Sequence, residues 1–315
     1  MSKNTLFNIL FMPIAWLPLP LLYLIADLIA PILNHIVRYR RHTIDANLRL
    51  SFPNLDDRQR NKIIHDYYRH LADLLAEAVY NLRSTPAQIK QRYKIANRQL
   101  IDRYYEQGQS VILMSAHYHN WEFMVVGLGM LFLHHGIGVG KPLNNKGFGR
   151  WLTAKRTRFG TQVVDQTDVR DAFDYYSRHR VPCVYLMLGD QSPSNTHKCY
   201  WTTFLNQETG FLFGSEYFAR KYNYPVIYYE VKKVKRGHYE IELQELCPDP
   251  ASAPLYSITQ SYISRLEALL TKAPTPWLWS HKRWKRKRPP EEPLHPRQKQ
   301  NNDHTTNKPT NSPLQ

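Results

Sequence analysis

The residues best suited to chemistry lie in the segment VILMSAHYHNWEF, which places His117 five residues before Glu122. A histidine accepts a proton near neutral pH, and a carboxylate that holds its second ring nitrogen fixes the tautomer. Such a pair activates a hydroxyl group. The same spacing also occurs by chance, so a His and a Glu with no shared function are the alternative. We interpret the neighbouring His119 as a surface or supporting residue.

The surrounding residues predict a strand, a turn and the start of a helix. Residues 111–114 form an apolar run bounded by small residues, which is typical of a buried strand. Residues 120–122 are predicted to begin a helix, whose free backbone N–H groups could face a developing negative charge. In α/β proteins the carboxyl ends of strands carry the site, so we expect His117 at that edge of the sheet.

Two further groups of polar residues are site candidates. Asp190 and Gln191 follow a predicted strand over residues 184–188, and therefore share the sheet edge with His117. Ordinary turn chemistry is the alternative for this pair. Arg156 and Arg158 end a predicted helix and could bind a phosphate or neutralise an oxyanion. A solvated basic helix face is the alternative there.

Apolar strands alternate with helical segments through most of the chain. This alternation predicts an α/β fold with a mainly parallel sheet covered by helices on both faces. The period-two pattern of residues 238–244 indicates an edge strand, and the 204–211 stretch a loop entering a helix. Residues 47–53 read as a connector. The other strands are predicted over residues 137–140, 161–164, 183–188 and 225–231, and the helices over residues 56–80, 86–107, 121–134, 146–159, 169–179, 211–222 and 255–270.

Length and charge limit the function classes. A chain of 315 residues can bury a full core, and its 42 Lys and Arg against 26 Asp and Glu give a net charge of +16. That excess implies an anionic partner: a nucleic acid, an acidic phospholipid, a phosphorylated substrate or an acidic carrier protein. The three cysteines suggest neither a disulfide framework nor a zinc knuckle.

The N-terminal segment predicts attachment to a membrane. Residues 5–26 carry no charged side chain, and an apolar segment of this length is long enough to cross a bilayer. Pro13, Pro18 and Pro20 interrupt the segment, so an interfacial helix pair fits as well as a spanning helix. The arginines at 38, 40 and 41 follow it and predict that the rest of the chain faces the cytoplasm.

The C-terminal end combines tryptophans with cations. Residues 276–288 contain three Trp side chains among six cations, which favours a membrane interface over a merely solubilising basic tail. The Pro-, Asn- and Thr-rich chain after Pro289 predicts disorder. The expected organisation is therefore a membrane anchor over residues 1–42, a catalytic domain over residues 43–288 and a disordered tail over residues 289–315.

Together these features resemble the bacterial lipid A late acyltransferases, the lauroyl/myristoyl transferase family within the glycerophosphate acyltransferase-like group. The resemblance extends over residues 6–287. It rests on the apolar N-terminus, the H-x4-E core in SAHYHNWE, the RTR sequence, the GDQ turn, the F-x-N and T-G stretch, and the closing W-x-x-x-R-W-K. Tyr118-His119 and Lys141-Pro142 depart from the family pattern, which leaves the identity of the acceptor open.

The resemblance implies a mechanism and partners. The family's His-Glu pair maps to His117 and Glu122, its functional arginine to Arg156 and its strand-end aspartate to Asp190. His117 would deprotonate an acceptor hydroxyl that attacks the thioester of an acyl chain on acyl carrier protein, with Arg156 stabilising the oxyanion. The resemblance implies no metal, no cofactor and no covalent enzyme intermediate. Substrate contacts are expected from Asn120, Lys141, Arg158, Asp190 and Gln191.

The implied setting is the bacterial inner membrane, with the catalytic domain facing the cytoplasm and an anionic lipid A precursor as acceptor. A lysophospholipid or aminoacyl lipid acceptor is the main alternative. A basic, membrane-attached binding protein without catalysis is the alternative from another class. We do not expect a nucleic acid partner, because no nucleic-acid motif is found.

Overall fold

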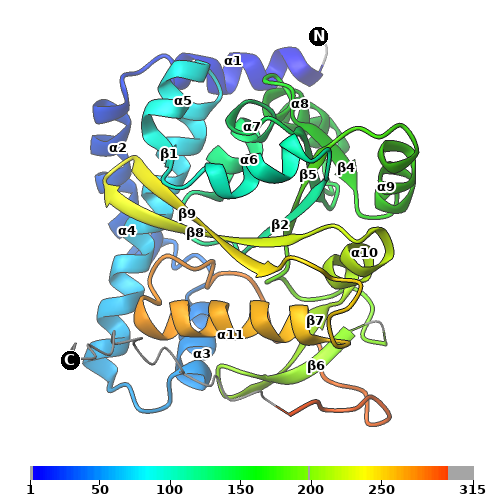
Figure 1. Ribbon diagram of the computed structural model, residues 1–315. Coiled ribbons are helices and arrows are strands. Elements are labelled where there is room, and N and C mark those ends of the chain that lie inside the picture. The colour runs from blue at the N-terminus through cyan, green and yellow to red at the C-terminus, as the bar shows by residue number, and fades with distance from the viewer. Residues whose placement is uncertain (1–2, 198, 297–315) are drawn as a thin grey trace, which may run out of the picture.

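The computed structural model describes residues 3–197 and 199–296 and has a seven-stranded sheet at its centre (Figure 1). The strand order is β4-β3-β5-β2-β8-β9-β1, and every neighbouring pair is parallel except β8 with β9. A separate antiparallel hairpin contains β6 and β7. The strands are β1 (Tyr93–Ile95), β2 (Val111–Ser115), β3 (His135–Gly140), β4 (Gln162–Asp165), β5 (Cys183–Leu188), β6 (Cys199–Phe204), β7 (Gln207–Leu212), β8 (Val226–Lys235) and β9 (His238–Cys247).

Helices cover both faces of this sheet, so the predicted α/β class is confirmed (Figure 1). The helices are α1 (Lys3–Ala15), α2 (Leu19–Pro31), the π-helical η1 (Ile32–Ile36), α3 (Arg41–Ser51), α4 (Asp57–Asn81), α5 (Pro86–Arg92), α6 (Gln99–Glu106), α7 (Trp121–Leu131), α8 (Lys146–Arg156), α9 (Val169–Arg178), α10 (Gly214–Tyr222) and α11 (Ser257–Lys272).

The central strand β2 shows why the sheet needs cover on both sides. All of its residues are buried, and its side chains alternate between two cores. Ile112 and Met114 join the core under α9, α10 and α11. Val111 and Leu113 join the core under α5, α6 and α7. A strand buried on both faces reads as a continuous apolar run, which is the pattern seen in the sequence.

Several predicted elements are wrong in detail. The helix predicted over residues 86–107 is interrupted by β1, which pairs with β9, so β9 is not the edge strand. The connector predicted over residues 47–53 belongs largely to α3. The stretch predicted as a loop into a helix is the β6–β7 hairpin, whose turn residues Leu205 and Asn206 both have positive φ, 47° and 63°. Two such residues suit a tight hairpin turn.

The N-terminal segment forms two helices that separate just before Pro18, in line with the interrupted helix predicted there. Leu22 and Ala26 of α2 pack against Ala72 and Ala76 of α4, so one side of the segment is held by the body of the protein. The stretch Leu19–Ile36 is long and apolar enough to cross a membrane by length and composition, and 28% of it is buried. The boundary predicted at residue 43 stays a prediction.

The chain after Pro289 is partly ordered, which corrects the prediction of disorder for residues 289–296. The backbone N–H of His295 donates to the carbonyl of Trp201, and its carbonyl accepts from the Thr202 hydroxyl. This segment therefore adds to the edge of β6. Edge strands leave backbone groups unpaired, and a passing segment can satisfy them. The rest of the predicted tail lies outside the described residues.

Candidate active site

His117 and Asp190 meet at the carboxyl edge of the sheet. Ser115, the last residue of β2, pairs with Leu188, the last residue of β5. His117 and Asp190 each lie two residues beyond that pair, so the parallel register brings them together. This is the sheet edge at which the sequence predicts both residues.

The Asp190 carboxylate accepts three hydrogen bonds, two of them from His117. Its Oδ1 atom lies 2.7 Å from His117 Nδ1, and its Oδ2 atom accepts from the His117 backbone N–H at 2.9 Å and from the Trp277 indole at 2.8 Å. Asp190 is 2% exposed. Burial alone would raise the pKa of Asp190, but the charge and hydrogen bonds of His117 and the Trp277 bond hold it below its ordinary value. An ionised Asp190 requires the imidazole proton on Nδ1.

The second ring nitrogen of His117 is therefore the basic one. Nε2 lies 3.1 Å from the side-chain nitrogen of Gln191, which can donate a hydrogen bond to its lone pair. The Trp121 ring packs edge-on against the imidazole, with 5.0 Å between the ring centroids. Gln191 thus occupies the position that a substrate hydroxyl would need.

Glu122 does not contact the His117 ring, which corrects the predicted partner. Its carboxylate forms a two-pronged ion pair with Arg156, with Nε to Oε2 at 3.0 Å and a terminal nitrogen to Oε1 at 2.5 Å. The physical reason is that α7 begins at Trp121, between the two residues, and directs the Glu122 side chain towards α8. The partner of His117 comes from a different strand.

Asn120 and Arg158 both make bonds that hold the scaffold, although Arg158 also lines the second cavity described below. Asn120 is 2% exposed, caps α7 by accepting from the Phe123 N–H at 3.1 Å, and donates to the buried carboxylate of Glu77. Burial raises the pKa of Glu77. Arg158 donates to the backbone carbonyls of Asn81 and Lys155, both at 2.5 Å, and burial lowers its pKa to about 10. The structure gives both residues structural bonds, and the substrate contacts predicted for them stay predictions.

A cavity of about 550 Å³, lined by both polar and apolar side chains, opens at His117. It is bounded by the ends of β3 and β5, and its lining includes Lys141, Arg170 and Gln191. Lys141 is exposed, so its ammonium group can reach a substrate. The structure thus brings together four predicted site residues, His117, Lys141, Asp190 and Gln191, at one opening.

A second cavity of about 280 Å³ lies beside the Glu122–Arg156 pair. Its lining is mostly apolar and comes from α1, α4, α7 and α8, with Phe11, Val126 and Trp151 as examples. The ion pair is the polar end of an otherwise apolar groove. Such a groove suits a hydrocarbon chain whose head group lies at the charged end.

The closing tryptophan-rich segment was predicted to lie in a membrane interface, and for three tryptophans this is wrong. Trp277 and Trp279 are 2% and 0% exposed, and Trp277 binds Asp190 directly. The Trp279 indole donates to the Pro274 carbonyl at 2.7 Å, and the Trp284 indole to Thr209 at 2.8 Å. Indoles are costly to leave in water, and this chain buries them in protein instead. The alternating Trp-Leu-Trp spacing was the one feature of the sequence that could have indicated that Trp277 and Trp279 point to the same, buried side.

Within residues 3–197 and 199–296, no three His, Cys, Asp or Glu side chains converge in a way that could hold a metal ion.

The structure thus combines a histidine fixed by a buried carboxylate with an apolar groove that ends in an arginine, two features that an acyl-transfer enzyme can use. The chain matches the family model for bacterial lipid A biosynthesis acyltransferase over residues 3–286, and it belongs to that family. The family resemblance is confirmed, and membership implies an acyltransferase of lipid A biosynthesis. Comparison with curated protein sequences gives no match.

Proposed function

We propose that this protein transfers a fatty acyl chain from the thioester of acyl carrier protein to a hydroxyl group of a lipid A precursor, with His117 as general base. The observation that carries the proposal is the His117 ring, held through Nδ1 by Asp190 at 2.7 Å and left with a basic Nε2 at the mouth of a cavity. No cofactor is needed for this reaction. Family membership supports the acyl transfer and the class of acceptor.

The first step is the exchange of Gln191 for the acceptor. The substrate hydroxyl would take the place of the Gln191 amide, which lies 3.1 Å from Nε2. Nε2 would then remove the hydroxyl proton as the oxygen attacks the thioester carbonyl, and the carrier thiol would leave with that proton. The imidazolium formed in between is stabilised by the Asp190 carboxylate, which stays ionised.

Arg156 would stabilise the oxyanion of the tetrahedral intermediate. Its ion pair with Glu122 fixes the guanidinium plane at the entrance to the apolar groove. The N-terminal N–H groups of α7, at Trp121 and Glu122, lie between this arginine and His117 along the chain. A preorganised set of donors of this kind stabilises developing negative charge without reorganisation. Glu122 then acts as a positioning residue for Arg156.

The apolar groove fits the acyl chain, and the cavity at His117, with Lys141, Arg170 and Gln191 in its lining, fits the acceptor. Phe11 of α1 lines the groove, so the N-terminal helices contribute to the acyl site. The same helices expose a series of large apolar side chains, namely Ile9, Ile14, Trp16, Leu21, Leu24, Leu28, Ile32 and Ile36. An apolar surface of this kind supports docking onto the inner leaflet of the bacterial inner membrane, with the body in the cytoplasm. The net charge of +16 suits both an acidic carrier protein and an anionic lipid.

The test is transfer of a labelled acyl chain from acyl carrier protein to a tetraacylated lipid A precursor and to a lysophospholipid. We expect transfer to the precursor by the wild type and by His179→Ala, which removes an exposed histidine on α9's C-terminal side. We expect His117→Ala to lose at least about two orders of magnitude. Transfer only to the lysophospholipid would mean that the acceptor is a lysophospholipid and not a lipid A precursor. A folded His117→Ala protein with the activity of the wild type would refute the mechanism.

A further inference from the structure

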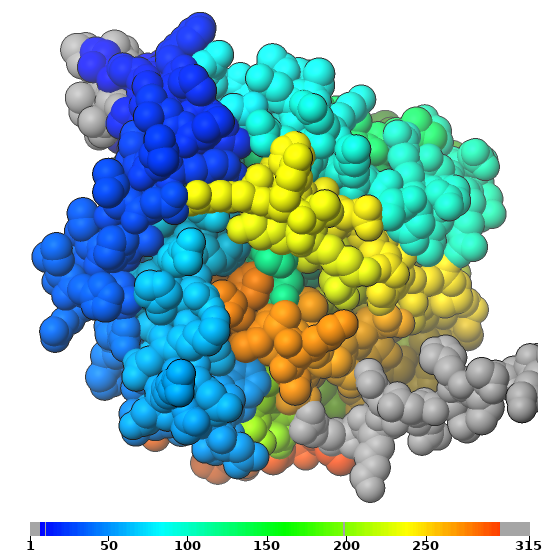
Figure 2. All heavy atoms as spheres, turned by 90° about the vertical axis from the view of Figure 1, so that its left-hand side faces the viewer, coloured from blue at the N-terminus to red at the C-terminus, as the bar shows by residue number. Residues whose placement is uncertain are grey.

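A third cavity lies apart from the two that form the site. It has a volume of about 420 Å³ and is enclosed by α4, the β8–β9 hairpin and the chain at Thr275 and Pro276. Figure 2 shows this face of the molecule, with α4 in cyan, the hairpin in yellow and the later segment in orange around the hollow. The cavity shares none of its lining residues with the two cavities of the active site.

The lining carries an excess of positive charge. Arg69, Lys233 and Arg236 contribute three cations against the two carboxylates of Asp66 and Asp73. Lys233 lies 3.2 Å from Asp73, and Arg236 donates to the same carboxylate at 2.9 Å. Arg69 makes no hydrogen bond or ion pair within the described residues. Its side chain is exposed at the cavity edge, where a ligand can reach it. Arg236 also pairs with Asp27, outside the lining, and the charge of Arg69 acts on the same carboxylate, so among the described residues Arg69 alone of the three cations lacks an ion pair.

Two histidines on the lining have unpartnered ring nitrogens. His70 Nε2 and His119 Nδ1 are buried without a hydrogen-bond partner, and the two rings meet edge to face with 5.5 Å between their centroids. The His70 ring also interacts with the Pro276 backbone carbonyl, which uses the single N–H of the neutral ring, so His119 is the ring that can donate to a ligand. His70 is 6% exposed. Burial lowers the pKa of His70 to about 3 and that of His119 to about 2, so both rings are neutral at pH 7. Unpaired buried polar atoms are rare, and a bound ligand is one explanation for them.

The combination of side chains favours an anion as that ligand. A guanidinium and an ammonium group are the usual partners of phosphate oxygens, and a neutral imidazole adds one N–H donor. A metal ion does not fit, because the three cations would repel it and no three ligating side chains converge in the described part of the chain. A tetrahedral phosphate group matches both the charge and the donors.

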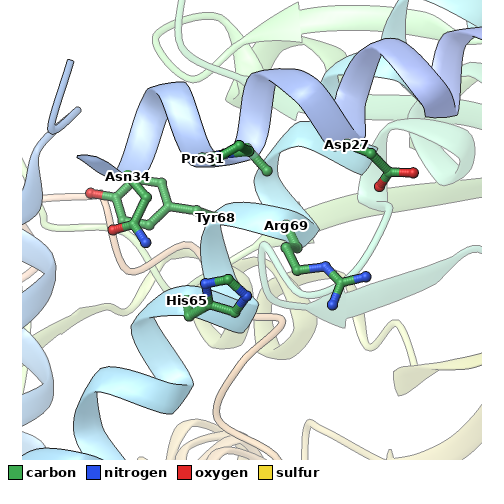
Figure 3. Close-up of a pocket in the computed structure, with 7 residues that line it drawn as sticks. Asp27, Pro31, Asn34, His65, Tyr68 and Arg69 are labelled. Carbon is green, nitrogen blue, oxygen red and sulfur yellow. The ribbon is translucent and has the colours of Figure 1, made fainter. Parts of the chain in front are cut away.

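A neighbouring hollow extends this cavity towards the N-terminal helices. It has a volume of about 260 Å³, and Arg69 lines both spaces. Figure 3 shows His65, Tyr68 and Arg69 of α4 beside Asp27 and Pro31 on the apolar helical stretch. Leu28, Ile32 and Ile36 of that stretch are exposed. A phosphate group could thus arrive as a lipid headgroup from a membrane surface or as free phosphate from solution.

We propose that the cavity between α4, the β8–β9 hairpin and residues 275–276 is a second anion-binding site, which takes a phosphate group through Arg69, Lys233 and His119. The site also touches the catalytic turn. The His119 backbone N–H donates to the Pro276 carbonyl at 3.1 Å, next to Trp277, which holds Asp190. A ligand in this cavity would therefore contact the segment next to Trp277, the residue that holds Asp190 in place for His117. The proposal goes beyond acyl transfer and does not depend on it, because its readout is binding.

The test measures binding to the full-length protein in neutral detergent or neutral-lipid nanodiscs. One arm titrates inorganic phosphate, and the other adds phosphatidic acid to nanodiscs of otherwise neutral lipid. Arg69→Ala and Lys233→Ala remove one cation each from the cavity. Arg58→Ala is the matched control, because it removes an exposed arginine near the start of the same helix, outside the cavity lining. Thermal unfolding of each variant checks that the fold is retained.

We expect each cavity variant to weaken binding at least about tenfold, as loss of a charge-assisted bond does, and Arg58→Ala to bind as the wild type does. Such a loss for inorganic phosphate supports a site for the free anion. Such a loss for phosphatidic acid alone supports a headgroup site. Absence of binding in both arms, or an equal loss in Arg58→Ala, would overturn the proposal.

Discussion

Replacement of Asp190 by asparagine tests whether Asp190 or Glu122 is the carboxylate that serves His117. Oδ2 accepts two N–H groups, from the His117 backbone at 2.9 Å and from Trp277 at 2.8 Å, so the asparagine oxygen must take that position. The asparagine NH2 group then faces His117 Nδ1, 2.7 Å away in the native structure. Because NH2 can only donate, Nδ1 must give up its proton, and the proton moves to Nε2. The base at Nε2 is lost although the geometry is kept.

The comparable change in a serine protease triad costs about 10⁴ in kcat, so we expect a loss of roughly 10³–10⁴ here. That is about 4–5.5 kcal/mol of transition-state stabilisation. Glu122→Gln is the matched control, since it also converts a carboxylate to an amide but acts on Arg156. We expect it to cost no more than about 100-fold.

The assay is single-turnover acyl transfer from acyl carrier protein to the lipid A precursor, with thermal unfolding as the check on folding. An Asp190→Asn protein that is folded and keeps activity within about tenfold of the wild type would refute the assignment. So would a Glu122→Gln protein that loses as much as Asp190→Asn, because the carboxylate on α7 would then be the one that serves the base.

Three further predictions concern the groups around the site. Arg156→Lys should lower transfer about 10- to 100-fold, because lysine cannot keep the two-pronged pair with Glu122; unchanged kcat/KM would contradict this. Asn120→Ala should lower the free energy of unfolding by about 1–2 kcal/mol, measured in urea, since α7 loses its cap; no change would mean that the cap is not needed. His70 should make the protein sensitive to acid. Its pKa of about 3 lies below its ordinary value of 6.5, so the unfolded chain takes up the proton first as the pH falls. The stability from neutral His70 is complete above pH 6.5 and is lost towards pH 3, with about 2 kcal/mol gone at pH 5. His70→Gln should reduce the difference in unfolding free energy between pH 8 and pH 5 by that amount, and an unchanged difference would contradict the assignment.

Much of the architecture was predictable because it depends on local patterns. The apolar run at β2, the 3.6-residue rhythm of α4 and the alternation of strands with helices each follow from the neighbouring residues. His117 and Asp190 were both predictable as site residues, since each follows a strand in a parallel sheet. The two-residue turn of the β6–β7 hairpin was missed, because its flanking strands pack against distant segments and its asparagine was the only local signal.

The amino-acid sequence by itself determined the α/β class, the apolar N-terminal helices and the family, and it indicated His117 as the candidate base. Only the tertiary structure decided which carboxylate serves that base, because the strand order β5-β2 brings Asp190 to His117 from 73 residues away while α7 turns the nearby Glu122 towards Arg156. It also decided that Trp277 is a ligand of Asp190 rather than a membrane contact. Sequence patterns report which face of an element is buried, whereas the partners of a polar side chain depend on how distant elements are placed.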